Sequence, residues 1–319
     1  MTTVPAVSSP TPPSEAPARV LTVASNKGGV GKTTVASNLA IYFRALREDL
    51  PVLIAGLDDQ STLDRMFSLG DRTGGEGNLK HAFAERSFDR VARLGQYGIH
   101  FVPSPPDLIG LKARAEDTGT LRRIVARSSQ GGVVIFDTKS DLEALTQNAL
   151  MAADRVLVPV ADWASLEEAA KIFTFLERHR PARRVARVLL TLADLRIRLD
   201  AEGHDLRGRL EAEVRARGWP LYRTTLTRSP RVEALNSATG RPMSILHHAS
   251  GTPVHRQLKA LAEEVLAELA LDGDAPARRP SSARRVVASR APEAERAEDW
   301  KTLFLRSLRR IQGQGPGPV

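Results

Sequence analysis

A glycine-rich loop between a short apolar strand and an amphipathic helix constrains the fold of this chain more than any other feature. The loop covers residues 26–34 and follows a buried-strand pattern at residues 20–24. Apolar residues at helical spacing then continue over residues 33–46. A strand that turns through glycines into a helix is typical of α/β folds, in which the helix returns the chain for the next parallel strand.

The rest of the middle region alternates in the same way. We expect strands at residues 52–57, 100–102, 132–136, 155–160 and 185–190, and helices at 121–128, 142–152, 166–178 and 206–217. Short apolar strands that alternate with amphipathic helices predict βαβ units, and hence an α/β fold with a mainly parallel, twisted sheet flanked by helices. We expect this domain to span residues 19–271.

Both ends of the chain differ in composition from this domain. Residues 1–18 are rich in Pro and Ser, so we expect a disordered arm that is too short to hold a helix-turn-helix domain. An Arg- and Pro-rich linker at 272–296 precedes a basic amphipathic helix at 297–312 and a disordered end at 313–319. We expect both tails to act as linkers or interaction arms, and we expect no operator-specific repression.

The composition excludes several classes of protein. The 319 residues include no cysteine, which excludes disulfides, thiolate metal sites and cysteine nucleophiles and fits a reducing, cytoplasmic setting. No apolar run reaches the roughly 18 residues that a membrane span requires. Lys and Arg number 46 against 37 Asp and Glu, a formal net charge of +9. Such a charge favours polyanionic partners, either nucleic acid or an anionic membrane surface.

The residues of the loop meet the requirements of phosphate binding. Gly28, Gly29 and Gly31 allow backbone N–H groups to surround phosphates, and the helix that follows directs its positive end toward them. We expect Lys32 to reach the β- and γ-phosphates and the Thr33 hydroxyl to bind Mg²⁺. The alternative is a glycine-rich turn that binds nothing.

Two lysines distinguish this loop from the plain phosphate-loop pattern. Asn26 stands where that pattern requires glycine, and Lys27 follows it. The run KGGVGKTT at residues 27–34 resembles the ParA/MinD/Soj family of P-loop ATPases, whose loops read K-G-G-x-G-K-T-T. The resemblance implies a three-layer P-loop NTPase fold, with ATP and Mg²⁺ as cofactors. It also implies that the nucleotide is bound by Gly28, Gly29, Val30, Gly31, Lys32, Thr33, Thr34 and, through the strand segment LLTLADLR, Thr191 near the adenine.

The resemblance further implies three catalytic residues, Lys27, Lys32 and Asp58. In this family the first lysine of the loop crosses a homodimer interface to the partner's nucleotide, as an arginine finger does, so ATP would join two subunits. The segment VLIAGLDDQ resembles VLLIDLDPQ and places Asp58 on the aspartate that orients the attacking water. Gly56 replaces the family's usual Asp. Asp59 replaces its usual Pro, which would alter the switch loop, so we expect slow hydrolysis without a partner.

The segment VVIFD at residues 133–137 is similar to a Walker B strand. Asp137 would therefore hold Mg²⁺ through water, while a helix-capping carboxylate is the alternative role for both Asp137 and Asp58. Their positions at strand ends favour ligand binding. The family's usual continuation is replaced by Thr138, Lys139 and Ser140, and Thr227 replaces a usual Pro in a later family segment.

The resemblance implies a DNA surface, because ParA-type dimers bind DNA without sequence preference. The candidates are Arg223, Arg228, Arg231 and Arg241, with a solvated basic loop as the alternative. Phosphate contacts alone would make this binding strongly salt-dependent. The helix at 297–312 favours a second interpretation, since MinD-like relatives carry such a helix and its Trp and Phe suit a membrane interface. The helix could instead dock to a partner or to DNA, or pack on its own domain, and these alternatives stay open.

Two functions follow from these observations. The first is a ParA-type ATPase, cytoplasmic and nucleoid-associated, that positions or segregates a cellular cargo through hydrolysis stimulated by a protein partner. The second is a MinD-like membrane-associated ATPase that regulates site placement. A metal-cluster or nitrogenase-type relative is excluded because it needs cysteines at the dimer face. A P-loop kinase is disfavoured because no acceptor-binding segment accompanies Asp58.

Overall fold

The structure, a computed structural model, describes residues 17–58, 62–69, 76–181, 185–194, 205–237 and 242–271. Several sequence-based predictions lie outside these residues. They are residues 1–16 of the predicted arm, Asp59, Arg241, and the predicted linker, amphipathic helix and end over 272–319.

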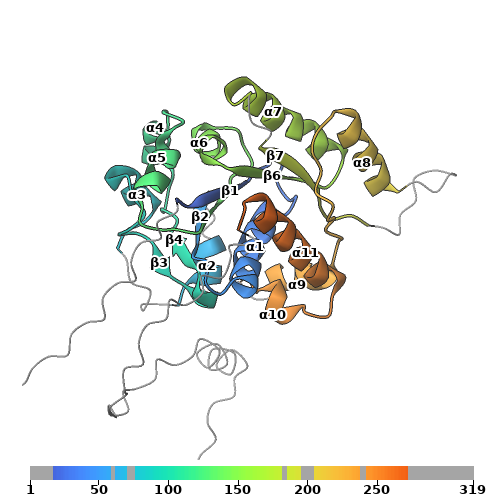
Figure 1. Ribbon diagram of the computed structural model, residues 1–319, viewed down its shortest axis with the longest axis horizontal. Coiled ribbons are helices and arrows are strands. Elements are labelled where there is room, and N and C mark those ends of the chain that lie inside the picture. The colour runs from blue at the N-terminus through green and yellow to red at the C-terminus, as the bar shows by residue number, and fades with distance from the viewer. Residues whose placement is uncertain are drawn as a thin grey trace, which may run out of the picture. The chain divides into compact units, whose positions relative to one another are not determined.

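Seven strands form one twisted sheet in the order β3-β4-β2-β5-β1-β6-β7 (Figure 1). Their bounds are β1 Arg19–Val23, β2 Val52–Leu57, β3 Arg93–Leu94, β4 His100–Val102, β5 Val133–Thr138, β6 Arg155–Val160 and β7 Ala186–Leu190. Neighbouring strands pair in parallel except β3 and β4, which are antiparallel. The expected mainly parallel sheet is thereby confirmed.

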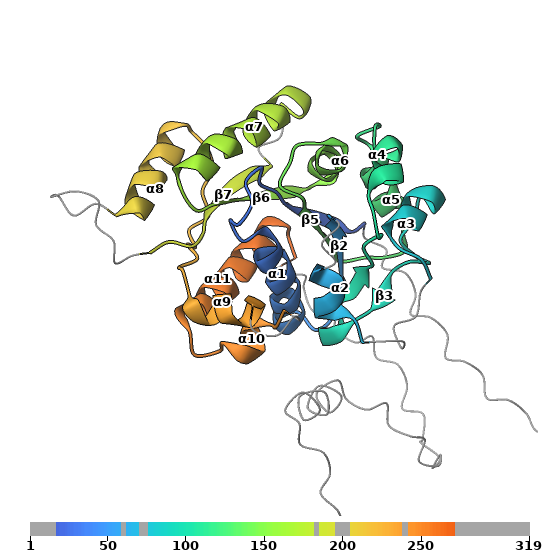
Figure 2. The same ribbon diagram turned by 180° about the vertical axis from the view of Figure 1, so that it is seen from behind.

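Helices cover both faces of the sheet and make three layers (Figures 1 and 2). One face carries α1 Lys32–Leu46, α2 Thr62–Phe67, α9 Pro230–Ser237, α10 Ile245–His248 and α11 Pro253–Glu268. The other carries α3 Leu79–Glu85, α4 Ile109–Arg114, α5 Thr120–Arg127, α6 Ala144–Ala152, α7 Trp163–His179 and α8 Leu206–Ala216. None of these described helices has both the length and the apolarity to cross a lipid bilayer.

The sheet separates two hydrophobic cores. Successive side chains of β5 enter opposite cores, with Val133 and Ile135 on the α1 side and Val134 and Phe136 on the other. Every residue of β2 and β5 is buried. Strands covered on both faces read as continuous apolar runs, which is why these two were recognisable in the sequence.

Most predicted elements are present within one or two residues of their expected bounds. The helix expected at 166–178 begins earlier, at Trp163, because Asp162 caps its N-terminus. The helix expected from 142 begins at Ala144, after Glu143. Among the described residues, the sequence analysis did not anticipate the short elements β3, α2, α3, α4, α9 and α10, which carry few periodic apolar positions.

The candidate residues gather where the parallel strands end. The loop at 26–31 follows β1, Asp58 follows β2, and Asp137 lies at the end of β5. The strand register places Asp137 beside both Val23 of β1 and Gly56 of β2. Ligands of open α/β sheets bind at this edge, so the fold brings the predicted phosphate loop and carboxylates to one place.

Candidate functional site

The loop between β1 and α1 has the backbone geometry of an anion site. Gly29 and Gly31 adopt left-handed backbone conformations, with φ angles of 77° and 91°. A Cβ at either position would meet nothing within 4 Å. Glycine is therefore favoured there by the left-handed backbone conformation and not by a lack of room for a side chain. Gly31 precedes α1, and among the described residues no side chain caps the helix and no acidic residue lies in its first turn. The first-turn N–H groups can therefore receive an anion.

Lys32 is the first residue of α1, and its side chain reaches back to the loop. Its side chain is almost fully buried, and its Nζ donates to the Lys27 carbonyl oxygen at 3.0 Å and to Ser140 Oγ at 2.5 Å. Burial lowers the pKa of Lys32, while the negative charges of the nearby aspartates oppose that shift. The sequence analysis attached no role to Ser140, which comes from the segment that departs from the family pattern.

Asp137 and Thr33 lie together beside Lys32. The Asp137 side chain is 3% exposed, and burial raises its pKa to about 7 although the Thr33 hydroxyl donates a hydrogen bond to it. Within the described residues its Oδ1 has no hydrogen-bond partner. A buried, unpaired carboxylate oxygen next to a hydroxyl fits a hydrated Mg²⁺, which prefers oxygen ligands and retains water.

Two further carboxylates lie near this centre. Asp58 is half-buried at the end of β2, and its charge acts on both Lys32 and Asp137. Asp64 of α2 accepts from the backbone N–H of Ser104 at 3.0 and 3.2 Å, and burial raises its pKa to about 6. Sequence reasoning missed Asp64, because no motif marks a carboxylate on so short a helix.

Lys27 extends away from its own phosphate loop. Its Nζ lies 2.7 Å from Asp162 Oδ2, at the beginning of α7. Asp162 also caps α7 by accepting from the Ser165 N–H at 2.7 Å. Burial raises the pKa of Asp162, but hydrogen bonds from Lys27 and Ser165 outweigh it and leave that pKa below its usual value. Asp162 is a second residue that the sequence did not single out.

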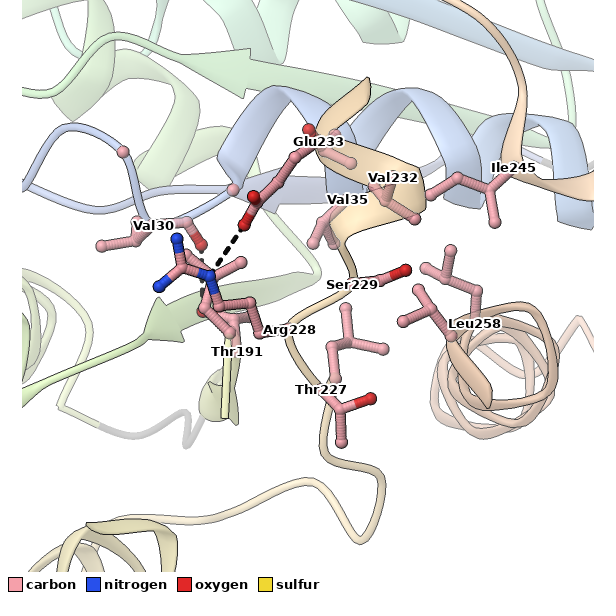
Figure 3. Close-up of a pocket in the computed structure, with 16 residues that line it drawn as sticks. Val30, Val35, Thr191, Thr227, Arg228, Ser229, Val232, Glu233, Ile245 and Leu258 are labelled. Carbon is pink, nitrogen blue, oxygen red and sulfur yellow. Dashed lines mark hydrogen bonds and ion pairs between the residues drawn. The ribbon is translucent and has the colours of Figure 1, made fainter. Parts of the chain in front are cut away.

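A cavity of about 400 Å³ opens beside the loop (Figure 3). The loop residues Gly29–Gly31, the residues after β7, the segment around α9, and α11 line it. Thr191 lies in its wall, where the hydroxyl donates to the Val30 carbonyl oxygen at 2.9 Å. Apolar side chains such as Val232 and Leu258 form the side away from the loop. The cavity thus joins the phosphate loop to a compartment of suitable size and polarity for a nucleoside.

The described arginines of the predicted DNA surface lie in different settings. Arg228 lines the cavity and pairs with Glu233 at 2.8 Å. The Nε of Arg231, on α9, donates to the His248 carbonyl oxygen at 3.0 Å. The Arg223 side chain is 90% exposed. All three arginines are exposed, and each has its own partner within the protein.

Two departures from the family pattern have local structural reasons. A Cβ on Gly56 would lie 3.3 Å from Leu63 Cδ1 of α2, so a side chain there would require Leu63 to shift slightly. The backbone N–H and hydroxyl of Thr227 donate to Gln257 Oε1 at 3.0 and 3.1 Å. Proline has no N–H and could not make the first of these bonds.

Comparisons with known proteins agree with this geometry. A sequence profile for an AAA domain matches residues 18–183. The chain is 33% identical over 257 residues to the chromosome-partitioning ATPase Soj of Thermus thermophilus, covering 79% of this chain and 96% of that protein. It is 30% identical over 265 residues to the chromosome partitioning protein ParA of Caulobacter vibrioides, covering 78% of this chain and 94% of ParA.

A solved structure extends the comparison to the fold. Cobyrinic acid a,c-diamide synthase from Mycobacterium smegmatis, with a bound ATP analogue and magnesium, matches with a TM-score of 0.58 and 22% identity, covering 78% of this chain and 94% of that one. ATP and Mg²⁺, the cofactors expected from the sequence, are those of P-loop ATPases, and the resemblance to the ParA/MinD/Soj family is confirmed. The loop has the geometry of a phosphate site, and the sequence matches Soj and ParA over nearly their whole length. The chain therefore belongs to the ParA/Soj family of P-loop ATPases.

Proposed function

We propose that this chain is a ParA-type ATPase that dimerises on ATP, binds DNA without sequence preference and positions or segregates a cargo. The observation that carries the proposal is the placement of the two loop lysines. Lys32 is buried against the loop and contacts the Lys27 carbonyl oxygen and Ser140, whereas the Lys27 side chain reaches Asp162 at the beginning of α7. A lysine held outside its own phosphate site can serve the nucleotide of a second subunit, so ATP would join two copies of the chain.

The other residues of the site have roles in this scheme. Lys32 and the loop N–H groups bind the phosphates, and Thr33 and Asp137 hold Mg²⁺, which neutralises phosphate charge when bound. Asp58 orients the attacking water. Thr191 and the cavity beside the loop receive the nucleoside. Hydrolysis is slow until a protein partner completes the site.

The scheme makes ATP a switch between two states. The ATP-bound dimer lies on the nucleoid, in the cytoplasm, and hydrolysis stimulated by the partner releases it. The similarity to Soj and ParA, both chromosome-partitioning proteins, supports a chromosomal cargo for this chain. A MinD-like membrane role would depend on the helix predicted at 297–312, outside the described residues, and is the alternative outcome of the test below.

Binding to plasmid DNA of unrelated sequence tests the proposal. The protein is mixed with DNA in ATP, ADP or no nucleotide at two salt concentrations. We expect binding that requires ATP and weakens with salt. Absence of binding in every nucleotide state, together with sedimentation on anionic liposomes, would contradict the proposal and favour the MinD-like role.

Two variants separate nucleotide binding from turnover. Lys32→Ala should abolish nucleotide binding and with it DNA binding, because the buried ammonium is the phosphate contact. Asp58→Ala should still bind ATP but lose turnover, which leaves the dimer on DNA. Lys80→Ala is the matched control, since this lysine pairs with Asp107, outside the loop. Normal turnover by Asp58→Ala would rule out the role given to Asp58.

A further inference from the structure

A groove lies at the β7 edge of the sheet, between α8 and an extended segment at residues 219–227. In both ribbon views α8 lies at that edge (Figures 1 and 2). The segment runs parallel to β7, with bridges from Val188 to Leu221 and from Ala193 to Thr227. The groove encloses about 280 Å³. The residues that line it are Arg207, Glu211, Arg215, Trp219, Leu221, Tyr222, Arg223 and Thr225.

The positions of these residues follow from the two periodicities. Arg207, Glu211 and Arg215 are four residues apart and therefore share one face of α8. The extended segment contributes mainly alternate residues, among them Leu221 and Arg223, from one side of its backbone. One helix face and one strand face thus oppose each other along the groove.

The groove carries more positive than negative charge. Three arginines and one carboxylate, Glu211, line it. Glu211 lies 2.5 Å from Arg215 and 3.7 Å from Arg207. Arg207 Nε has no hydrogen-bond partner among the described residues. Arg223 lies 3.8 Å from the buried Glu264, but its side chain is 90% exposed. The residues that line the groove therefore carry a net charge of +2, from three arginines and one glutamate.

The apolar residues of the groove are already engaged in packing. Trp219 stacks on Phe173 of α7 with ring centroids 4.3 Å apart, and the Arg217 guanidinium lies 5.2 Å from the Trp219 ring centroid. Tyr222 is only 2% exposed. The groove therefore offers no free aromatic face for stacking bases and no exposed apolar side chain for insertion into a bilayer. These features favour contact with the phosphates of a polyanion.

We propose that this α8 groove binds phosphate groups of the DNA backbone, through Arg207, Arg215 and Arg223. The inference rests on the DNA binding in the proposed function, and it adds two arginines to Arg223, the one groove residue that the sequence analysis nominated. Contacts of this kind hold DNA without reading its sequence. Each phosphate contact steepens the dependence of log affinity on log salt by about 0.9.

The test compares two double variants of the full chain. Arg207→Gln/Arg215→Gln removes two charges from the groove, and Arg90→Gln/Arg114→Gln removes two exposed charges elsewhere. Affinity for a duplex of unrelated sequence is measured with ATP over a range of salt, with thermal melts and ATP turnover as checks of folding. We expect the groove variant to bind on the order of tenfold more weakly, with a salt slope shallower by roughly two. The control should bind within about twofold of the unmodified chain.

A third variant predicts a change of opposite sign. Glu211→Gln removes the carboxylate that partly neutralises Arg207 and Arg215, so it should bind DNA more tightly. Wild-type affinity and slope in the groove double variant would overturn the inference while leaving the proposed function intact. If the groove double variant lost binding to poly-glutamate but still bound DNA, the groove would be assigned to an acidic protein, and the inference would also be overturned. An unmodified chain that binds no DNA would overturn both.

Discussion

At the scale of single residues, Asp162 has two roles at the beginning of α7. It caps the helix through the Ser165 N–H, and it holds Lys27 at 2.7 Å. In the proposed dimer Lys27 has to leave Asp162 before it reaches a second subunit. The ion pair therefore opposes dimerisation, by roughly 1 kcal/mol or less for a pair so exposed to solvent.

This opposition predicts the effect of Asp162→Asn. Asparagine caps helices about as well as aspartate but carries no charge, so the variant keeps α7 and weakens the hold on Lys27. We expect the ATP concentration at half-maximal dimerisation to fall by a factor of about two to five. Sedimentation velocity across an ATP titration measures it. Asp107→Asn, which removes a carboxylate paired with Lys80, is the control and should change nothing. A higher ATP requirement in Asp162→Asn would contradict the role given to the pair.

At the scale of elements, the start of β5 fixes how closely β2 and β5 approach. Gly132 has a φ angle of 74°, and a Cβ there would lie 2.2 Å from the Pro51 carbonyl oxygen. That oxygen accepts from the Val133 N–H at 3.0 Å. The pairing of β5 with β1 and β2 then carries Asp137 to its place beside the loop.

Gly132→Ala should therefore destabilise the fold by about 2 kcal/mol or more, because it adds both a strained backbone and a clash with Pro51. Denaturant unfolding gives the free energy. Gly110→Ala is the comparison, since that glycine lies in α4 with no positive φ and nothing within 4 Å of its Cβ position. It should be neutral or slightly stabilising. Equal losses of unfolding free energy in the two variants would show that the close approach of Gly132 to Pro51 does not contribute to stability.

At the scale of the whole molecule, the candidate site joins segments from most of the described chain. The cavity is lined by residues from Gly29 to Leu258, and Lys32 contacts Ser140 of the segment after β5. A ligand that binds such a site binds the folded chain and not the unfolded one. Its binding free energy therefore adds to the stability of the fold.

Thermal unfolding should report this linkage. With ATP and Mg²⁺ at about 100 times the dissociation constant, the gain is about 2.7 kcal/mol, a rise in Tm of several degrees. Removal of Mg²⁺ with EDTA should reduce the rise, and Lys32→Ala should abolish it. Lys80→Ala should retain it. A full Tm rise in Lys32→Ala would show that the ligand binds elsewhere.

Much of the fold and part of the site could be predicted from local sequence patterns. Apolar periodicity is a property of neighbouring residues, so it located β2, β5 and most long helices. The glycines of the loop indicate a backbone conformation that few other residues adopt. They marked the phosphate loop and, with it, Lys32 and Thr33. Asp137 followed from the similarity of residues 133–137 to a Walker B strand, supported by its position at the end of a buried strand, where open sheets bind ligands.

The partners of the two lysines could not be predicted in this way. Lys32 and Ser140 are 108 residues apart in the chain, and Lys27 and Asp162 are 135 apart. The sheet order places β1 between β5 and β6, so the segment after β5 reaches one side of the loop and the segment after β6 reaches the other. Local patterns specify which strands exist but not which strands are neighbours. The phosphate loop could therefore be recognised in the sequence, whereas the different partners of Lys27 and Lys32 follow from long-range strand pairing.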